Sequence, residues 1–486
     1  MTASRAGFDA FRRYYADPAG SLATDRFEQR EQLFRLRWQY YTNEALEDPV
    51  LWSVYKRTYR LYRGSKALFN PTRRLVDLYA GMIYPGFVAP DNDEMKPGLR
   101  NALPLPDGTD PQLRTAIAQV CRWSNWQSRK GLYVRYGAAL GSCLGEIIDD
   151  VERQKVYMQL TWPGFVSDLR LDAQGNVQMY ELTYEATERI EGTDTDDTYT
   201  FTKYVDANTI RYEVDGNTIS EFGNPYGFVP AVWLRHTDMG DDLGAPALRA
   251  QSKMDALNSL ASHAVDNIHK TMAAPILVTG SGTVSPLFAD TTKRPGQETE
   301  TPLDAEALDI LKGPADAGFV SMNVPTGDAL TMMERLLAEI QADHPELTFY
   351  EEMRSMQSVT GPAASRLMGD VEAPIMEAQA NYDMQLTKML QMAVAIGGWR
   401  LSGGAWPDGT QQQRNLAGFD LNSYGRGDLD FTIEPRPIFP LTAQEELELE
   451  RQQWDFEQQK QQPPDGQVEN AVRTRLRDAG NGARNA

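Results

Sequence analysis

The chain has 486 residues, which is too long for one simple core, so several modules are expected. Its formal net charge is −20. A protein that grips nucleic acid by neutralising phosphates is expected to be basic, or to gather its basic residues on one face, and this chain shows neither pattern clearly. Two interpretations remain: the chain does not contact nucleic acid, or it lines a passage along which DNA slides without adhering.

Two cysteines, Cys121 and Cys143, exclude a disulfide framework and a cysteine-rich zinc site, and we expect two separate buried thiols. No run approaches the ~18 apolar residues that a membrane span needs. The N-terminal stretch, with Arg5, Arg12 and Arg13, lacks the apolar core of a signal peptide. We therefore expect neither export by that route nor contact with a membrane.

The first 145 residues predict helices. Residues 27–41 are rich in aromatic residues and arginine, and a helix that opens at Asn70-Pro71 ends at Pro85-Gly86. A further amphipathic helix is predicted over 127–144.

From residue 146 to about 235 the pattern changes to alternation with period two, which predicts strands. These predicted strands cover 156–160, 177–182, 198–202 and 210–214. Turn signals such as Asp215-Gly216 separate them. We expect one antiparallel sheet with a solvated face, and a hydrated hairpin tip at the acidic run 188–197.

A helix is predicted over 243–268, where apolar residues recur at steps of three and four and form one seam. The seam consists of Met254, Leu257, Ala261, Ala264 and Ile268. Polar residues lie across from it, which predicts a hydrated side: Lys253, Asp255, Ser259 and Asp266.

A second helix, over 328–342, repeats this pattern, and Pro345 ends it. Its seam consists of Leu330, Met333, Leu337 and Ile340. Between the two helices lies a small lobe with strand-like residues 275–278 and 319–324 and a short helix over 303–311. Two helices that leave a body, carry a lobe and return form a stalk, which suits assembly better than catalysis.

Beyond the stalk we expect a helix over 349–357, a small-residue loop over 358–366, and a long helix over 372–401. A last strand is predicted from Phe431. A very polar helix follows over 442–459, with a capping box formed by Thr442 and Glu445.

Motifs for catalysis are mostly missing. The sequence contains no Gly-Lys pair, which excludes a P-loop ATPase at motif level, and no GxGxxG opens a helix. The four histidines form no metal-binding pair. Adjacent carboxylates could serve as general acid and base, namely Asp149 and Asp150 with Glu152, and Asp241 with Asp242. Acidic residues at such positions more often cap helices or lie in solvated loops, and we favour that interpretation.

Four stretches together resemble the portal proteins of tailed bacteriophages. Residues 67–77 (Ala-Leu-Phe-Asn-Pro-Thr-Arg-Arg-Leu-Val-Asp) resemble the early helix of that family, and His236 with residues 244–262 resembles the entry to its first stem helix. Residues 359–367 (Val-Thr-Gly-Pro-Ala-Ala-Ser-Arg-Leu) resemble its tunnel loop. Residues 431–440 resemble its passage to the crown, and the order of these parts carries the resemblance, which spans about 27–459.

The resemblance implies an α+β subunit with wing, stem, clip and crown regions, in a ring usually of twelve copies. The corresponding wing covers 1–242, with its sheet at 146–235, and resumes at 345–439, with a tunnel loop at 357–370 and a long helix at 372–401. The stem helices correspond to 243–271 and 326–344, with the clip between them at 272–325. The crown and tail correspond to 440–486. One departure is Gly361-Pro362, where many relatives have Gly-Ser or Gly-Val.

It also implies a non-enzymatic role without a cofactor. The ring would lie at the capsid vertex of the virion, after assembly in the host cytoplasm, and double-stranded DNA would pass through it. Its expected partners are the terminase large subunit, head-completion (adaptor) proteins, and capsid and scaffolding proteins. On the tunnel surface we expect Asp and Glu to outnumber Lys and Arg.

We chose candidate functional residues by their positions in the expected clip, tunnel loop and stem. Clip contacts are expected at Lys293, Arg294, Glu298 and Glu300, and DNA-facing residues at Val359, Thr360, Arg366 and Met368. The stem seam comprises Met254, Leu257, Ala261, Ile268, Leu330, Met333 and Leu337. The alternative from another class is a soluble carboxylate-dependent hydrolase or transferase with its site in the 146–242 sheet domain. A weaker third option is another virion protein, such as a scaffold or minor capsid protein.

Overall fold

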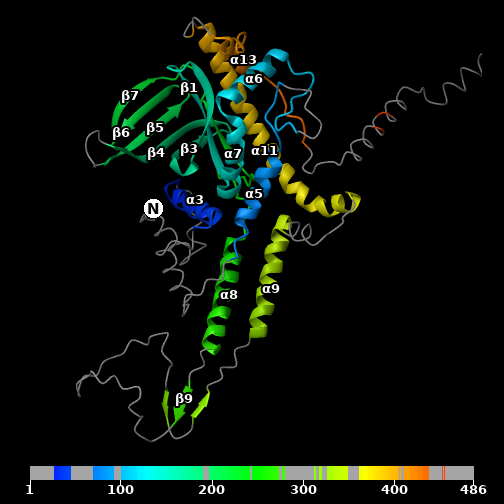
Figure 1. Ribbon diagram of the computed structural model, residues 1–486. Coiled ribbons are helices and arrows are strands. Elements are labelled where there is room, and N and C mark those ends of the chain that lie inside the picture. The colour runs from blue at the N-terminus through cyan, green and yellow to red at the C-terminus, as the bar shows by residue number, and fades with distance from the viewer. Residues whose placement is uncertain are drawn as a thin grey trace, which may run out of the picture. The chain divides into compact units, whose positions relative to one another are not determined.

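The computed structural model describes residues 27–44, 69–91, 100–189, 196–240, 243–272, 276–279, 311–313, 317–319, 326–347, 361–403, 406, 410–436, 451 and 454. The chain divides into two compact units, Met1–Glu434 and Pro435–Ala486. The first unit holds every named element and belongs to the predicted α+β class (Figure 1). In the second, Arg451 and Trp454 are helical, and most of the crown prediction lies outside the described residues.

Within the described ranges, four helices precede the strands. α3 (Phe27–Thr42), α5 (Thr72–Ile83) and α7 (Trp126–Leu140) lie close to their predicted ranges, and α6 (Pro111–Trp123) lies in the part of the chain that was predicted to be helical without bounds. Local signals set their ends. Asp110 caps α6 by accepting a hydrogen bond from the backbone N–H of Gln112 at 3.1 Å. Gly141 ends α7 with φ of 98°, a conformation that favours glycine. Cys121 and Cys143 are buried and unpaired, as predicted.

The strands form two antiparallel sheets in place of the single sheet that was predicted. The three-stranded sheet has the order β2-β1-β8, and the five-stranded sheet has the order β3-β4-β5-β6-β7. Their bounds are β1 (Ser142–Asp150), β2 (Lys155–Thr161), β3 (Val166–Leu171), β4 (Val177–Arg189), β5 (Asp196–Asp206), β6 (Thr209–Val214), β7 (Asn217–Gly223) and β8 (Ala231–Arg235). A short 3-10 helix, Pro163–Phe165, leads the chain from β2 in one sheet to β3 in the other. A core that includes Leu144 of β1 and Leu182 of β4 lies between them.

The long helix α11 (Gly361–Ser402) packs on the three-stranded sheet and on α5 and α6 (Figure 1). It also contacts α7, where the hydroxyl of Tyr382 donates a hydrogen bond to the carbonyl of Val134 at 3.1 Å. It begins eleven residues before the predicted helix, so residues 361–370 of the predicted tunnel loop are helical. Pro362 explains the difference, because proline is favoured in the first turn of a helix and interrupts it only further in. Pro374 does lie in the interior, where it removes a backbone hydrogen bond and is expected to bend the helix.

Two short helices follow, α12 (Gln411–Arg414) and α13 (Leu421–Arg426). Residues 431–436 form no strand, so the strand predicted from Phe431 is wrong. The backbone N–H of Glu434 does donate a hydrogen bond to the carbonyl of Pro104, at 3.0 Å.

The stalk elements are α8 (Gln251–Met272), β9 (Ile276–Thr279), β10 (Leu311–Gly313), β11 (Ala317–Phe319) and α9 (Thr326–Asp343). The helix predicted from residue 243 begins only at Gln251. Residues before it are engaged elsewhere, since Ala245 and Ala247 donate backbone hydrogen bonds to Thr237 and Ala138. β9, β10 and β11 form a small sheet in the order β10-β9-β11. Within the described part of the chain, no helix combines the length and hydropathy that crossing a bilayer requires.

Candidate functional site

The helices α8 and α9 lie side by side and run in opposite directions (Figure 1). Lys253, in the first turn of α8, forms an ion pair with Asp343 at the end of α9, with 2.7 Å between Nζ and Oδ2. Its Nζ also lies 3.8 Å from Glu339 Oε2. Met254, Leu257 and Ile340 are buried at this end of the pair. The two helices therefore close on each other near the body of the unit.

Further from this closed end, large apolar side chains of the pair are exposed. Ile268 is 46% exposed, Leu330 56% and Met332 57%. The predicted seam therefore divides into Met254 and Leu257, which are buried, Ala261, Met333 and Leu337, which are half-buried, and Ile268 and Leu330, which are exposed. An amphipathic helix normally buries its apolar stripe, and this pair leaves part of it open.

The hydrated side predicted for α8 is wrong at Asp255, Ser259 and Asp266, which are all buried. The N-terminal part of the chain covers this side. Tyr40 of α3 donates a hydrogen bond to Asp255, and the Asn258 side chain bonds both the N–H and the carbonyl of Phe69. These polar residues attach α8 to the body of the unit.

A second polar cluster holds the other helix at its C-terminal end. The hydroxyl of Tyr79 donates to Glu346 Oε1 at 2.8 Å, and burial together with this carboxylate raises the pKa of Tyr79. The backbone N–H of Arg249 donates to His344 Nε2 at 3.4 Å. Burial lowers the pKa of His344, which favours the neutral ring that this contact requires. Both helices are thus fixed to the body at one end.

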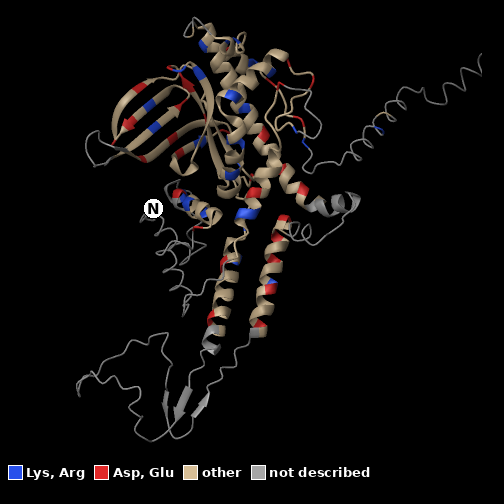
Figure 2. Ribbon diagram, in the orientation of Figure 1, with Lys and Arg blue, Asp and Glu red and all other residues tan. Residues whose placement is uncertain are grey.

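Acidic residues predominate on α9. The helix carries Asp328, Glu334, Glu339 and Asp343 against a single basic residue, Arg335 (Figure 2). All five are exposed. This helix therefore offers a surface that repels phosphate groups.

The remaining candidates from the sequence are not brought together by the described residues. Lys293, Arg294, Glu298 and Glu300 lie outside them, as do Val359 and Thr360. Arg366 and Met368 lie in the N-terminal part of α11, which is helical rather than the predicted loop.

Carboxylates of the 146–242 region are engaged in contacts between elements. Asp149 Oδ2 accepts hydrogen bonds from Arg400 Nε at 2.6 Å and from the Tyr226 hydroxyl at 2.8 Å. Asp150 pairs with Arg153, and Asp241 and Asp242 lie outside the described residues. Among the residues with defined positions, no group of three or more His, Cys, Asp or Glu side chains is placed to hold a metal ion.

One polar cluster was missed by the sequence analysis. Buried Glu146 of β1 accepts hydrogen bonds from Tyr180 of β4 and Lys203 of β5. The signal was present in β5, where Lys203 alternates in phase with Phe201 and Val205 and so shares their face of the sheet. A lysine on that face requires a buried anionic partner.

Comparison with protein-family models and with curated proteins finds no match to this chain. The class of the chain is described by its fold. It is an α+β chain with a long helix packed against a small sheet, and with an antiparallel helix pair that carries a second small sheet in the connecting chain. That pair leaves part of its apolar stripe exposed.

Proposed function

We propose that this chain is a portal-type subunit. Copies of it assemble into a ring at the vertex of a virus capsid, and double-stranded DNA passes through the ring during packaging and ejection. The observation that carries the proposal is the helix pair α8–α9, which closes at one end on Lys253 and Asp343 and leaves Ile268, Leu330 and Met332 exposed toward the other.

A ring is the arrangement that these exposed residues favour. Helices depend on tertiary packing of their apolar face for most of their stability. Neighbouring copies supply that packing when each contacts the next through different surfaces, and a rotation that closes gives a ring. The resemblance noted for the sequence suggests twelve copies.

Charge supports a passage for DNA. Each copy carries a net charge of −20, and α9 carries four acidic residues against one basic residue. A ring of such chains presents a surface that does not retain phosphates, so a duplex slides with little adhesion. Val359, Thr360, Arg366 and Met368 are the proposed DNA-facing residues.

The lobe between the two helices, residues 272–325, is the proposed docking site for the terminase large subunit during packaging and for head-completion proteins afterwards. Lys293, Arg294, Glu298 and Glu300 are the proposed contacts. Capsid and scaffolding proteins are the proposed partners of the surrounding wing.

Negative-stain images and light scattering of the purified protein test the ring. We expect particles with a central hole. Leu330→Asp combined with Met332→Asp should abolish them, because charges would replace the apolar contacts between copies. Ile219→Asp is a single-site control for an exposed apolar residue replaced by a charge, since Ile219 is 64% exposed on β7, away from the helix pair. A wild-type protein that stays monomeric at high concentration would refute the proposal.

A further inference from the structure

A joint between α8 and α9 lies where the helix pair meets the body of the unit. We define it by five residues: Arg249, Lys253, Asp343, His344 and Glu346. Lys253 and Asp343 form its exposed ion pair. His344 is buried, and its Nε2 accepts a hydrogen bond from the backbone N–H of Arg249. The joint therefore combines an exposed ion pair with a buried contact that depends on a titratable ring.

The buried contact requires one protonation state of His344. A neutral imidazole keeps one nitrogen as an acceptor, and here that nitrogen is Nε2, because a backbone N–H donates to it. The imidazolium ion carries a proton on both nitrogens, so protonation places two donors against each other. With 3.4 Å between Nε2 and the Arg249 nitrogen, the hydrogen bond is longer than usual and therefore weak. Protonation of His344 should break it.

An acceptor for the protonated ring belongs to the same joint. Glu346 is buried, and its Oε1 accepts a hydrogen bond from the Tyr79 hydroxyl at 2.8 Å. Its Oε2 is also buried and has no hydrogen-bond partner among the described residues. A buried carboxylate is costly unless it is paired, so this oxygen favours a new donor. The protonated ring of His344 can supply one.

Electrostatics shows that these groups face one another. Burial lowers the pKa of His344, and neighbouring charges act on it in both directions. Two carboxylates raise the pKa and two cations lower it: Glu346, Asp343, Arg249 and Lys253. The charges oppose each other, so burial sets the direction and the neutral ring is favoured near pH 7.

The body of the unit adds groups that do not titrate between pH 5 and 7.5. Burial, with the charges of Glu346 and of Glu377 in α11, raises the pKa of Tyr79 in α5, so its hydroxyl stays protonated. The ring of His236 packs on Tyr79, with 4.7 Å between ring centroids. Burial lowers the pKa of His236 to about 3, so this ring stays neutral. His344 is therefore the group of this cluster whose charge changes in mild acid.

We propose that the joint is a pH-sensitive switch. A neutral His344 binds the start of α8 to the end of α9 through the N–H of Arg249. A protonated His344 turns to Glu346 Oε2 and releases that N–H. The hydrogen bond from Lys253 lowers the pKa of Asp343, so their ion pair persists in mild acid and the joint loosens without coming apart. The inference goes beyond the proposed function, because the switch lies within one copy and requires no ring.

Hydrogen exchange of the Arg249 amide tests the switch. It is expressed as a protection factor at each pH, which removes the pH dependence of intrinsic exchange. Because the pKa of His344 is below 6.5 in the folded chain, we expect protection to fall between pH 7.5 and pH 5, by about fivefold, as for the loss of one hydrogen bond. Amides of residues 389–396, in the buried part of α11, should keep their protection, which separates local release from global unfolding. Unchanged protection of Arg249 would overturn the switch.

Two substitutions assign the response to the joint. His344→Gln keeps a side-chain acceptor that cannot be protonated, so the protection of Arg249 should become independent of pH. Glu346→Gln keeps an acceptor for Tyr79 but removes the charge that favours the protonated ring, so the fall in protection should move to lower pH. His263→Gln is the matched control, since His263 is half-buried on α8 outside the joint and should leave the wild-type response.

Thermal unfolding of each variant shows that it is folded before exchange is compared. A pH response that persists in folded His344→Gln would overturn the role of His344. An unchanged midpoint in Glu346→Gln would overturn the exchange of partners. Each outcome is read from a single copy, so a failure of the switch and a failure of the proposed ring are distinguishable.

Discussion

The hydroxyl of Tyr40 in α3 donates a hydrogen bond to Asp255 Oδ1 in α8, at 2.8 Å, across 215 positions of the sequence. Both residues are buried. A buried carboxylate is costly unless hydrogen bonds satisfy it. This contact therefore helps to set where α8 joins the body of the unit.

Tyr40→Phe should lower the free energy of unfolding by about 1.5–3 kcal/mol, because it removes a buried hydrogen bond to a charged group. Tyr41→Phe is the matched control. Tyr41 donates to Asp77 at 3.1 Å, and the Asp77 side chain is 41% exposed, so water replaces the lost contact. Urea unfolding of the two variants checks this, and equal losses would contradict it.

Close packing between α7 and α11 makes a second prediction. A Cβ added to Gly137 would lie 1.9 Å from the hydroxyl oxygen of Tyr382, which is fully buried. Gly137→Ala should therefore destabilise the fold by about 1–3 kcal/mol through overpacking. Gly81→Ala in α5 meets open space and should stabilise by about 0.5–1 kcal/mol, since alanine favours helix over glycine. Thermal unfolding distinguishes these opposite signs.

His236 gives a prediction about pH. Burial, with the nearby charge of Arg249, lowers its pKa from 6.5 to about 3, and its ring contacts Tyr79 and Tyr382. Because the pKa is lower in the folded chain, the unfolded chain binds the proton first. Stability should then fall as the pH drops below 6.5 toward 3, by up to ~1.4 kcal/mol per pH unit.

Urea unfolding at pH 7.5 and pH 5 measures this slope. His236→Gln should flatten it. His344→Gln removes a second histidine whose pKa is lowered by burial. In this variant the part of the pH dependence that comes from His236 should remain. A His236→Gln variant with the full wild-type slope would show that another group is responsible.

The spacing of apolar residues predicted many helices and strands, because that spacing is set by residues close together in the sequence. Residues 328–342 were expected to be helical, and α9 spans Thr326–Asp343. Alternation with period two predicted strands where β4, β5 and β6 lie. Partner choice depends on residues far apart in the sequence, so the strands were placed in one sheet, although β2 and β8 both pair with β1 in a separate sheet.

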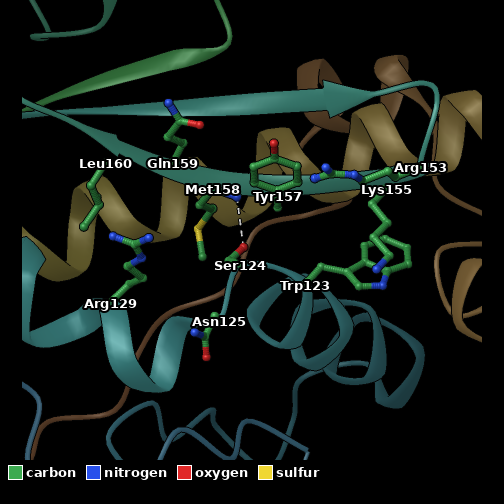
Figure 3. A pocket seen from close by; sticks show the side chains of 10 residues that line it. All are labelled: Trp123, Ser124, Asn125, Arg129, Arg153, Lys155, Tyr157, Met158, Gln159 and Leu160. Carbon is green, nitrogen blue, oxygen red and sulfur yellow. Dashed lines mark hydrogen bonds between the residues drawn. The ribbon is translucent and has the colours of Figure 1, made fainter. Parts of the chain in front are cut away.

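The candidate site was predicted only in part, for the same reason. The seam was found from its spacing, but which end would close depends on Lys253 meeting Asp343, ninety positions away. Asp255 was assigned to a hydrated side because nothing near it in the sequence indicates that Tyr40 covers it. The pocket where α6 and α7 meet β2 (Figure 3) was not predicted, because its cations Arg129, Arg153 and Lys155 come from separate elements that only the fold brings together.

Glu146 and Lys203 form a buried ion pair that links β1 to β5, with 2.5 Å between Oε1 and Nζ. Burial acts to raise the pKa of Glu146, but Lys203 and hydrogen bonds from Thr161 and Tyr180 outweigh it and hold the pKa below 4.5. The ion pair should therefore contribute its full stabilising free energy above pH 4.5. This stabilisation should be lost at lower pH, where the carboxylate becomes protonated in the folded chain.

Lys203→Met should cost about 3–5 kcal/mol at pH 7, because it leaves a buried carboxylate without its cation. Adding Glu146→Gln to that variant should recover part of the loss, since no buried charge remains. Arg153→Met, which breaks the exposed pair with Asp150, should cost no more than ~1 kcal/mol. Urea midpoints at pH 7 and pH 3.5 give the comparison, and a Lys203→Met variant as stable as Arg153→Met at pH 7 would show that the pair does not link the sheets.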